Sequence, residues 1–448
     1  MSNSSWSDLV TQLGGDQVVL KLSQALQSDQ QFLAFTDTDA LASSVTFGIK
    51  STESERAILV TVCNDSSYAS GKASDNEPLF TIAALPEQWE RFFRKIPQPG
   101  FQSFWGMLRY SMNGKNGAKI LGSQVDFARH AHIVRRVLEL LHEIHCGKTG
   151  EPLEDNEETE EQDFIQGHYI FLTLPLYGRC KIFVEQSGTG TQDLLFLHTA
   201  GADSRQYHAL MNDASLLPLY KMTAFDLPSH GRSFPSPNLL HGNHTLTEDA
   251  YIATIAAVIR AERLSRPVVV GASMAGQVCL AIAIRNAEVQ AGGVVPLEAC
   301  EHIARDRQWQ DKSPLVNGSL FNPEAIYGLC APTAPAANKR LVWHMYSGQA
   351  YGVFHGDLDF YNGGWDGRGR VGGIDGAECP VFMLTGEYDY STSPEMSRET
   401  AGRIPGARFE VMRGLGHFPA TENPEAFKPY LMKAVEWIQA QRKGQDLS

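Results

Sequence analysis

The chain has 448 residues, 43% of them hydrophobic and 20% charged, which is typical of a folded globular protein and long enough to favour two domains over one. The formal net charge of −13 disfavours nucleic acid or an anionic membrane surface as the main partner. No apolar run approaches the ~18 residues of a membrane span, so a transmembrane protein is disfavoured as well.

The start of the sequence lacks the basic and apolar regions of a signal peptide. The seven cysteines are odd in number, scattered, and form no C-x-x-C pair, which favours reduced thiols over disulfides or a zinc site. We therefore expect a cytoplasmic protein without membrane insertion, metal or cofactor.

Residues 1–147 predict a small α+β domain. The predicted helices cover 16–26, 86–93, 101–108 and 127–144, and the predicted strands cover 45–49, 57–63 and 79–83. No motif in this segment carries chemistry, so we expect an accessory domain.

The run from Phe80 to Phe93 in this segment resembles sterol-carrier-protein-like domains, which are built around an apolar pocket. The resemblance implies a lipid-binding accessory domain. The segment is also rich in aromatic residues, namely Trp89, Phe92, Phe93, Phe104 and Trp105. These side chains either form the core of this domain or dock it against the next one.

Eight acidic residues fall within the thirteen positions 151–163. Like charges at this density repel one another and stay solvated. We expect an acidic linker at 148–165.

Residues 166–298 and 379–441 predict a second domain in which strands alternate with helices. The predicted strands cover 169–174, 180–185, 194–198, 220–226, 268–270, 292–296, 380–384 and 408–412, and the predicted helices cover 202–212, 247–262, 277–284, 394–404 and 425–439. This alternation favours a mostly parallel sheet covered on both faces, whose ligands lie at the carboxyl ends of the strands.

One serine stands at such a strand end. The sequence G-A-S-M-A-G at 271–276 follows the strand 268–270 and precedes an apolar helix, so it presents Ser273 at a sharp strand-to-helix corner. The usual sequence motif of this corner is G-x-S-x-G, and here Ala275 replaces the second glycine. The small loop after His198 and the amide of Met274 are candidates for binding an oxyanion.

Two further loops after predicted strands carry the partners that a serine needs. The loop T-G-E-Y-D offers Glu387 and Asp389, of which Asp389 is better placed, and the loop G-L-G-H-F-P offers His417. A hydroxyl becomes a good nucleophile when a histidine takes its proton and a carboxylate fixes the tautomer of that histidine.

This constellation resembles the α/β-hydrolase superfamily over about residues 166–441. The string D-L-P-S-H-G-R-S at 226–233 is similar to a turn of that family. The resemblance implies that Ser273 is the nucleophile, Asp389 the acid and His417 the base. It also implies oxyanion amides at Ala200 and Met274, and it leaves Glu298 and Glu387 as alternative acids.

His198 is expected to support the oxyanion loop rather than to act as a base. Arg205 could bind substrate or brace its loop.

Residues 299–378 interrupt the alternation of strands and helices at the place where the family carries its cap. The segment is rich in aromatic residues, and Trp343, Tyr346, Phe354 and Trp365 are candidates for binding a bulky apolar or aromatic substrate. The spacing of His344, His355, Asp357 and Asp359 matches no common metal site.

We therefore expect a serine hydrolase that cleaves an ester, a lactone or a carbon–carbon bond next to a ketone in a polyketide-like substrate of secondary metabolism. A non-hydrolytic lyase, cyclase or acyl transferase on the same fold is one alternative. A lipid-binding protein with an idle serine is another, and a homodimer stays open.

Overall fold

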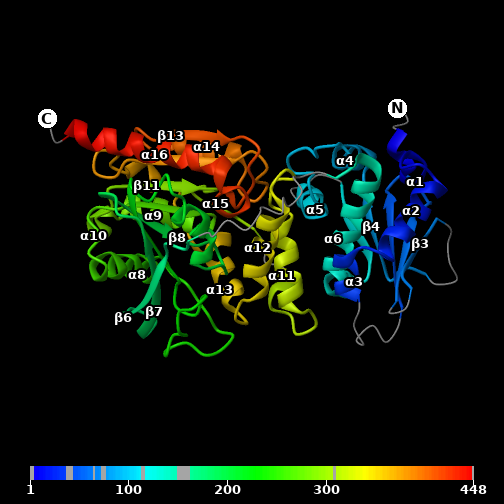
Figure 1. Ribbon diagram of the computed structural model, residues 1–448, viewed down its shortest axis with the longest axis horizontal. Coiled ribbons are helices and arrows are strands. Elements are labelled where there is room, and N and C mark those ends of the chain that lie inside the picture. The colour runs from blue at the N-terminus through cyan, green and yellow to red at the C-terminus, as the bar shows by residue number, and fades with distance from the viewer. Residues whose placement is uncertain are drawn as a thin grey trace. The chain divides into compact units, whose positions relative to one another are not determined.

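The computed structural model describes residues 5–36, 44–63, 66–71, 77–112, 117–148, 162–305 and 309–445. The chain divides into two compact units (Figure 1). The N-terminal unit comprises Met1–Glu151 and Ser313–Thr333, and the C-terminal unit comprises Pro152–Lys312 and Ala334–Ser448. Most of the predicted acidic linker, 148–165, lies outside the described residues. Among the described helices, none has the length and apolar composition needed to cross a membrane.

A five-stranded sheet forms the centre of the N-terminal unit. Its strand order is β3-β2-β1-β4-β5, with β1 parallel to β4 and the other neighbours antiparallel. The strands are β1 (Val45–Ser51), β2 (Ile58–Val62), β3 (Tyr68–Ser70), β4 (Phe80–Ala84) and β5 (Lys119–Gly122). The α-helices are α1 (Leu9–Gln12), α2 (Asp16–Leu26), α3 (Gln30–Thr36), α4 (Pro86–Phe92), α5 (Phe104–Met112), α6 (Gln124–Cys146) and α11 (Gly318–Tyr327). The predicted α+β class of this unit is confirmed.

The aromatic residues of the N-terminal unit pack mainly against one another. The ring centroids of Phe92 and Phe93 lie 4.9 Å apart, and those of Trp89 and Phe92 lie 5.9 Å apart. Trp89 is fully buried, and its indole N–H donates to the carbonyl of Lys50 at 3.0 Å, which satisfies its one polar atom. These side chains therefore belong to the core of the unit. Its resemblance to sterol-carrier-protein-like domains stays a prediction.

Part of the segment predicted as a cap, 299–378, belongs to the N-terminal unit instead. Its helix α11 packs against α6. The Arg135 guanidinium donates to the Glu324 carboxylate at 2.5 Å and lies 4.4 Å from the ring centroid of Tyr327. Both ends of this ion pair are buried. The sequence pattern around 313–333 does not reveal this packing, because the partner helix lies almost two hundred residues earlier.

Removal of the Glu324 charge should destabilise this helix pair. Glu324→Gln leaves the buried Arg135 charge less well compensated, so the free energy of opening α6 and α11 should fall by about 3 kcal/mol. Hydrogen–deuterium exchange of peptides from both helices measures this change. Glu55→Gln is the control. The Glu55 carboxylate is exposed and lies 4.0 Å from Lys50 Nζ, so this ion pair contributes little, and the substitution should leave exchange unchanged. Unchanged exchange of α11 in Glu324→Gln would contradict a stabilising role of the Arg135–Glu324 ion pair.

An eight-stranded sheet forms the centre of the C-terminal unit. Its order is β13-β12-β11-β10-β8-β9-β7-β6, with parallel pairing from β13 to β9 and antiparallel pairing of β7 and β6. The strands are β6 (Gln166–Leu174), β7 (Gly178–Ser187), β8 (Gln192–Leu197), β9 (Tyr220–Phe225), β10 (Val268–Ala272), β11 (Gly293–Leu297), β12 (Phe382–Gly386) and β13 (Arg408–Met412). The predicted mostly parallel α/β sheet is confirmed.

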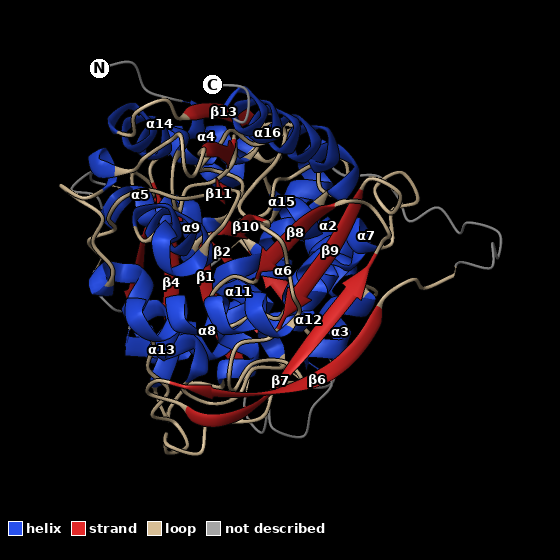
Figure 2. Ribbon diagram, turned by 90° about the vertical axis from the view of Figure 1, so that its left-hand side faces the viewer, coloured by secondary structure: helices blue, strands red, loops and turns tan. Residues whose placement is uncertain are grey.

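Helices cover this sheet. The α-helices of the unit are α7 (His208–Met211), α8 (Glu248–Ala261), α9 (Met274–Ile284), α10 (Asn286–Val289), α12 (Ala336–Ser347), α13 (Val353–Asp359), α14 (Pro394–Arg403), α15 (Pro419–Glu422) and α16 (Pro424–Gln445). Helix α9 packs on β10 and β11, and α16 packs on β11 and β12. Figure 2 shows β6 and β7 as two long paired strands, in red.

The central strands are buried along their whole length, as expected of parallel strands with helices on both faces. Every residue of β10, β11 and β12 is buried. Because neighbouring parallel strands end at one edge of the sheet, the loops after β8, β10, β11, β12 and β13 emerge at the same edge. These loops carry the residues that the sequence singled out.

Candidate active site

Ser273 occupies a strained corner between β10 and α9. Its backbone has φ 60° and ψ −119°, a conformation that residues other than glycine rarely adopt. The Ser273 amide donates to the carbonyl of Leu297 at 3.0 Å, which ties the corner to β11. The residue is 5% exposed. Strain of this kind persists only where the surroundings enforce it, and it is common at functional sites.

Two glycines allow the strand and the helix to meet at this corner. A Cβ on Gly271 would lie 2.8 Å from the Cβ of Ala275, and a Cβ on Gly276 would lie 2.3 Å from the carbonyl oxygen of Leu297. Ala275 is accommodated because Gly271 has no side chain, and the closest approach to β11 falls at Gly276. The departure from G-x-S-x-G therefore leaves the corner intact.

His417 lies against Asp389. Its Nδ1 donates to Asp389 Oδ2 at 2.8 Å, and both side chains are almost fully buried. The other oxygen of Asp389 accepts hydrogen bonds from the amides of Ser391 at 2.6 Å and Thr392 at 3.2 Å. These contacts fix the carboxylate and leave Nε2 as the ring nitrogen of His417 that faces away from it.

The two alternative acids have other partners. Glu387 accepts from the Arg413 guanidinium at 2.8 Å and from the Gly414 amide at 3.0 Å. Glu298 is fully buried and accepts from the Gly386 amide at 3.0 Å, while its second oxygen has no hydrogen-bond partner among the described residues. Burial, together with the Asp389 charge, raises the pKa of Glu298 well above its usual value. Burial and the Asp389 charge therefore favour the neutral form of the Glu298 carboxyl group.

The raised pKa of Glu298 predicts a pH-dependent stability difference. Because the pKa of this carboxyl group is higher in the folded chain than its ordinary value of 4.5, its contribution to stability falls as pH rises from 4.5 toward the folded pKa. Glu298→Gln removes this loss, so its stability advantage over the wild type should grow as pH rises from 5 toward the folded pKa of Glu298, by up to about 1.4 kcal/mol per pH unit. Urea denaturation of both proteins at pH 5 and at pH 7 measures this difference in the free energy of unfolding. Parallel pH dependence of stability in the two proteins would contradict a raised pKa of Glu298.

The loop after β8 leaves one amide unpaired. The Thr199 amide donates to Gln206 Oε1 at 2.7 Å, and the Gly201 amide donates to Asp357 Oδ2 at 2.7 Å. The amides of Ala200 and Met274, in contrast, have no hydrogen-bond partner among the described residues. They are the two predicted oxyanion donors.

His198 and Arg205 are engaged in their own loop. His198 Nδ1 donates to the Thr199 carbonyl at 2.9 Å, and Nε2 accepts from the Leu227 amide at 3.1 Å, so neither ring nitrogen is left to act as a base. The Arg205 guanidinium donates twice to the Asp203 carboxylate, at 2.8 and 2.6 Å. Both residues support the loop in this structure.

The predicted substrate-binding aromatic residues occupy different places. Tyr346 donates to or accepts from Thr199 Oγ1 at 2.6 Å, and its ring centroid lies 5.6 Å from that of Phe354. Trp365 is buried, with its backbone amide bonded to Phe360, and Trp343 is partly buried on α12. Tyr346 and Phe354 thus lie against the loop after β8, at Thr199 and Gly201 respectively.

Residues 194–429 match the model of a family described as the alpha/beta hydrolase family. The chain belongs to the alpha/beta hydrolase family. The match begins within β8, ends within α16 and includes Ser273, Asp389 and His417.

Solved alpha/beta hydrolase-fold structures resemble this chain at low identity. A thermophilic esterase from Thermogutta terrifontis is 20% identical, with a TM-score of 0.51, and covers 60% of this chain and 99% of its own. A putative aryl esterase from Burkholderia cenocepacia is 18% identical, with a TM-score of 0.51, and covers 61% of this chain and all of its own. A hydrolase from Pseudomonas aeruginosa is 17% identical, with a TM-score of 0.50, covering 60% and 98%. At this identity the likeness shows the fold. No curated protein matches.

Sequence reasoning assigned no supporting role to four polar residues that hold these loops. Glu422 accepts from the amides of Gly416 and Phe418, on either side of His417, and it is fully buried. Asp357 is paired with His230 and His244 rather than with the histidines near it in sequence. His230 stands inside the family-like string at 226–233, which was the one available signal.

Proposed function

We propose that this alpha/beta hydrolase family member is a serine hydrolase that acts through Ser273, His417 and Asp389. The observation that carries the proposal is the hydrogen bond between His417 and Asp389. Asp389 follows β12 and His417 follows the adjacent strand β13, at the edge of the sheet where the strained Ser273 lies. The free amides of Ala200 and Met274 support it, because acyl transfer needs two donors for an oxyanion.

In this mechanism Asp389 keeps the proton of His417 on Nδ1, so that Nε2 acts as the base. Nε2 takes the proton of the Ser273 hydroxyl as its Oγ bonds to the carbonyl carbon. The carbonyl electrons move to oxygen, and the amides of Ala200 and Met274 stabilise the resulting negative charge.

The intermediate collapses when the bond to the leaving group breaks and His417 Nε2–H gives its proton to that group. For an ester or lactone the proton goes to the alkoxide oxygen, and for a carbon–carbon bond next to a ketone it goes to the carbanion carbon. A water molecule, deprotonated by His417, then hydrolyses the acyl-enzyme and restores Ser273.

A bulky apolar or aromatic substrate, for instance one of polyketide type, is the class that the aromatic residues of 334–378 favour. Tyr346 and Phe354 pack on each other and approach the loop that holds Ala200. Phe418, directly after His417, lies 5.7 Å from Tyr346 between ring centroids. Apolar side chains around a nucleophile select apolar acyl groups and keep water away before the acyl-enzyme forms.

Turnover of a p-nitrophenyl ester series in H₂¹⁸O tests this function. We expect an initial burst or steady release of p-nitrophenol, and a carboxylic acid product that carries one ¹⁸O atom, with faster turnover for longer or aromatic acyl groups. Esterases of the same fold make esters the natural first substrates.

Two other outcomes would replace the proposal. Acylation of Ser273 followed by transfer only to an added alcohol or amine, without ¹⁸O incorporation, would indicate an acyl transferase. Binding of apolar ligands without any acylation would indicate a lipid-binding protein with an idle serine.

A further inference from the structure

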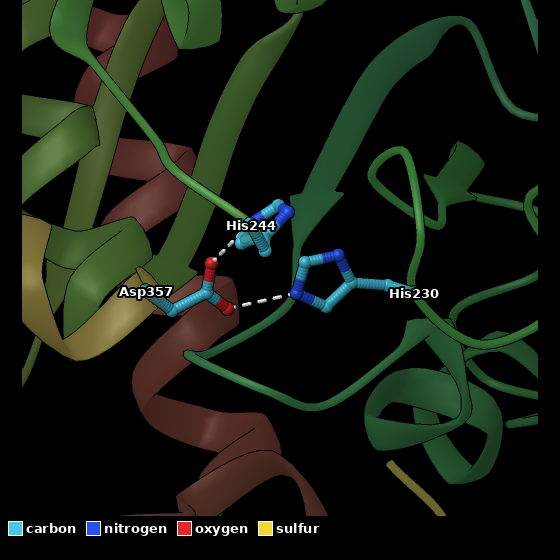
Figure 3. Close-up of side chains that lie close together, drawn as sticks. All are labelled: His230, His244 and Asp357. Atoms are coloured by element: carbon cyan, nitrogen blue, oxygen red, sulfur yellow. Dashed lines mark hydrogen bonds and ion pairs between the residues drawn. The ribbon is translucent and has the colours of Figure 1, made fainter. Parts of the chain in front are cut away.

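Two histidines and an aspartate form a buried cluster (Figure 3), and its carboxylate reaches the loop after β8 that holds Ala200. Asp357 lies on α13, His230 in the turn after β9, and His244 in the loop before α8. Asp357 Oδ2 is 2.8 Å from His230 Nε2, and Oδ1 is 3.0 Å from His244 Nε2. The three side chains are at most 5% exposed. The proposed reaction steps use none of them.

The hydrogen bonds define the charges in this cluster. His230 Nδ1 faces the Pro228 carbonyl at 3.1 Å, and a carbonyl only accepts, so this nitrogen carries a hydrogen. Its Nε2 must then donate to Asp357 as well, which makes His230 an imidazolium paired with a carboxylate.

Charged and titratable neighbours agree with this assignment. The groups that face His230 are Asp357, Asp226, His198 and His244. Although burial acts in the opposite direction, the Asp357 charge and hydrogen bond raise the pKa of His230, and His230 in turn holds the pKa of Asp357 below its usual range.

A third hydrogen bond links the carboxylate to the oxyanion loop. The Gly201 amide donates to Asp357 Oδ2 at 2.7 Å. Gly201 has a φ of 61°, and a Cβ there would lie 2.7 Å from the Phe354 ring, so the loop passes directly against α13. The position of the Ala200–Gly201 peptide therefore depends on Asp357.

The other side of Ala200 is held from α12. Thr199 Oγ1 and the Tyr346 hydroxyl lie 2.6 Å apart and are buried. Residues of the insertion between β11 and β12 thus fix the loop immediately before and immediately after Ala200.

We propose that Asp357 is a positioning residue that holds the oxyanion loop for the reaction, with His230 and His244 fixing its carboxylate and Tyr346 holding the loop from the other side. This inference rests on the proposed function, because it takes Ala200 as an oxyanion donor. Donors must be fixed within a few tenths of an ångström before charge develops, so a loosened loop should cost rate rather than ground-state binding.

The test compares variants of the full chain on the best p-nitrophenyl ester. Asp357→Ala should lower kcat by about 100-fold with KM changed by less than about threefold, since one oxyanion donor contributes at least this factor. Asp357→Asn keeps an acceptor for the Gly201 amide and should recover part of that loss. Tyr346→Phe, which removes one hydroxyl, should lower kcat by roughly tenfold at unchanged KM, about what one hydrogen bond contributes. Asp359→Ala is the matched control on the same helix, because its side chain is largely exposed, and it should behave as the wild type.

A trifluoromethyl ketone separates positioning from general stability. It forms a tetrahedral adduct with a serine and places an oxygen at the oxyanion position, so its affinity should fall across the variants by the same factors as kcat. Circular dichroism identifies a variant that fails to fold, and Tyr346→Phe then carries the test.

Several results would overturn the inference. One is an unchanged kcat in folded Asp357→Ala. Another is a loss in Asp357→Ala that appears as a rise of KM with an equal fall of kcat/KM, which would mean weaker substrate binding. A third is an affinity for the ketone that does not follow kcat across the variants. About one zinc per chain in the purified wild type, with activity lost on its removal by a chelator, would also overturn it and make the cluster a metal site. If the wild type neither turns over esters nor binds the ketone, the proposed function itself has failed.

Discussion

Replacement of Ser273 by alanine is expected to lower kcat on p-nitrophenyl esters by about six orders of magnitude, because the remaining groups no longer act as a unit. The loss should appear in kcat, with KM little changed, since the hydroxyl contributes to bond formation rather than to substrate binding. Steady-state kinetics on protein free of wild-type contamination measures it.

Ser265→Ala is the matched control for this variant. Ser265 is exposed and lies before the amino end of β10, whereas Ser273 lies at the carboxyl end of the same strand. The control should retain wild-type kcat and KM. A Ser273→Ala enzyme with more than a few per cent of wild-type kcat would assign catalysis to another residue.

Replacement of Asp389 by asparagine should lower kcat by about four orders of magnitude, because an amide favours the wrong tautomer of the catalytic histidine. His417 Nδ1 donates to Asp389, and an asparagine nitrogen at this position would instead donate to His417. Nε2 of His417 would then carry the ring hydrogen and could not accept the proton of the Ser273 hydroxyl.

Glu298→Gln provides the matched comparison, since it makes the same change in a buried acid at the end of the neighbouring strand β11. The raised pKa of Glu298 favours its neutral form, which glutamine resembles, and its oxygen accepts from the Gly386 amide rather than from His417, so kcat should change by less than about threefold. A large loss in Glu298→Gln together with a small one in Asp389→Asn would exchange the two roles.

Much of the C-terminal unit was predictable from local patterns. The predicted strands 194–198, 220–226 and 268–270 coincide with β8, β9 and β10 to within two residues at each end. Continuous apolar runs identify these strands because both of their faces are buried. The corner at Ser273 was predictable for a related reason, since small residues beside a strand end mark a close approach to a helix.

Long-range contacts between polar residues were not predictable. Asp357 pairs with His230 across 127 positions and with His244 across 113, and nothing in the spacing of these residues distinguishes them from His344 or His355. Glu324 likewise reaches Arg135 across 189 positions, which moves α11 from a predicted cap into the N-terminal unit. Periodicity reports which face of an element is buried, whereas partners are chosen by the tertiary fold.

The acid of the proposed mechanism was predictable from the sequence only in part. Asp389 and Glu387 both follow β12, and the sequence favoured Asp389 without excluding Glu387 or Glu298. Only the arrangement of the loops shows that Glu387 turns toward Arg413 while Asp389 turns toward His417.

The proposed mechanism requires that Ser273 is a nucleophile activated by His417. Labelling with a fluorophosphonate probe, followed by intact-mass and peptide mass spectrometry, tests it most directly. We expect a single adduct on Ser273 in the native protein and in Ser265→Ala, no adduct in Ser273→Ala, and strongly slowed labelling in Asp389→Asn. Absence of an adduct on the native protein, or an adduct that persists in Ser273→Ala, would contradict it.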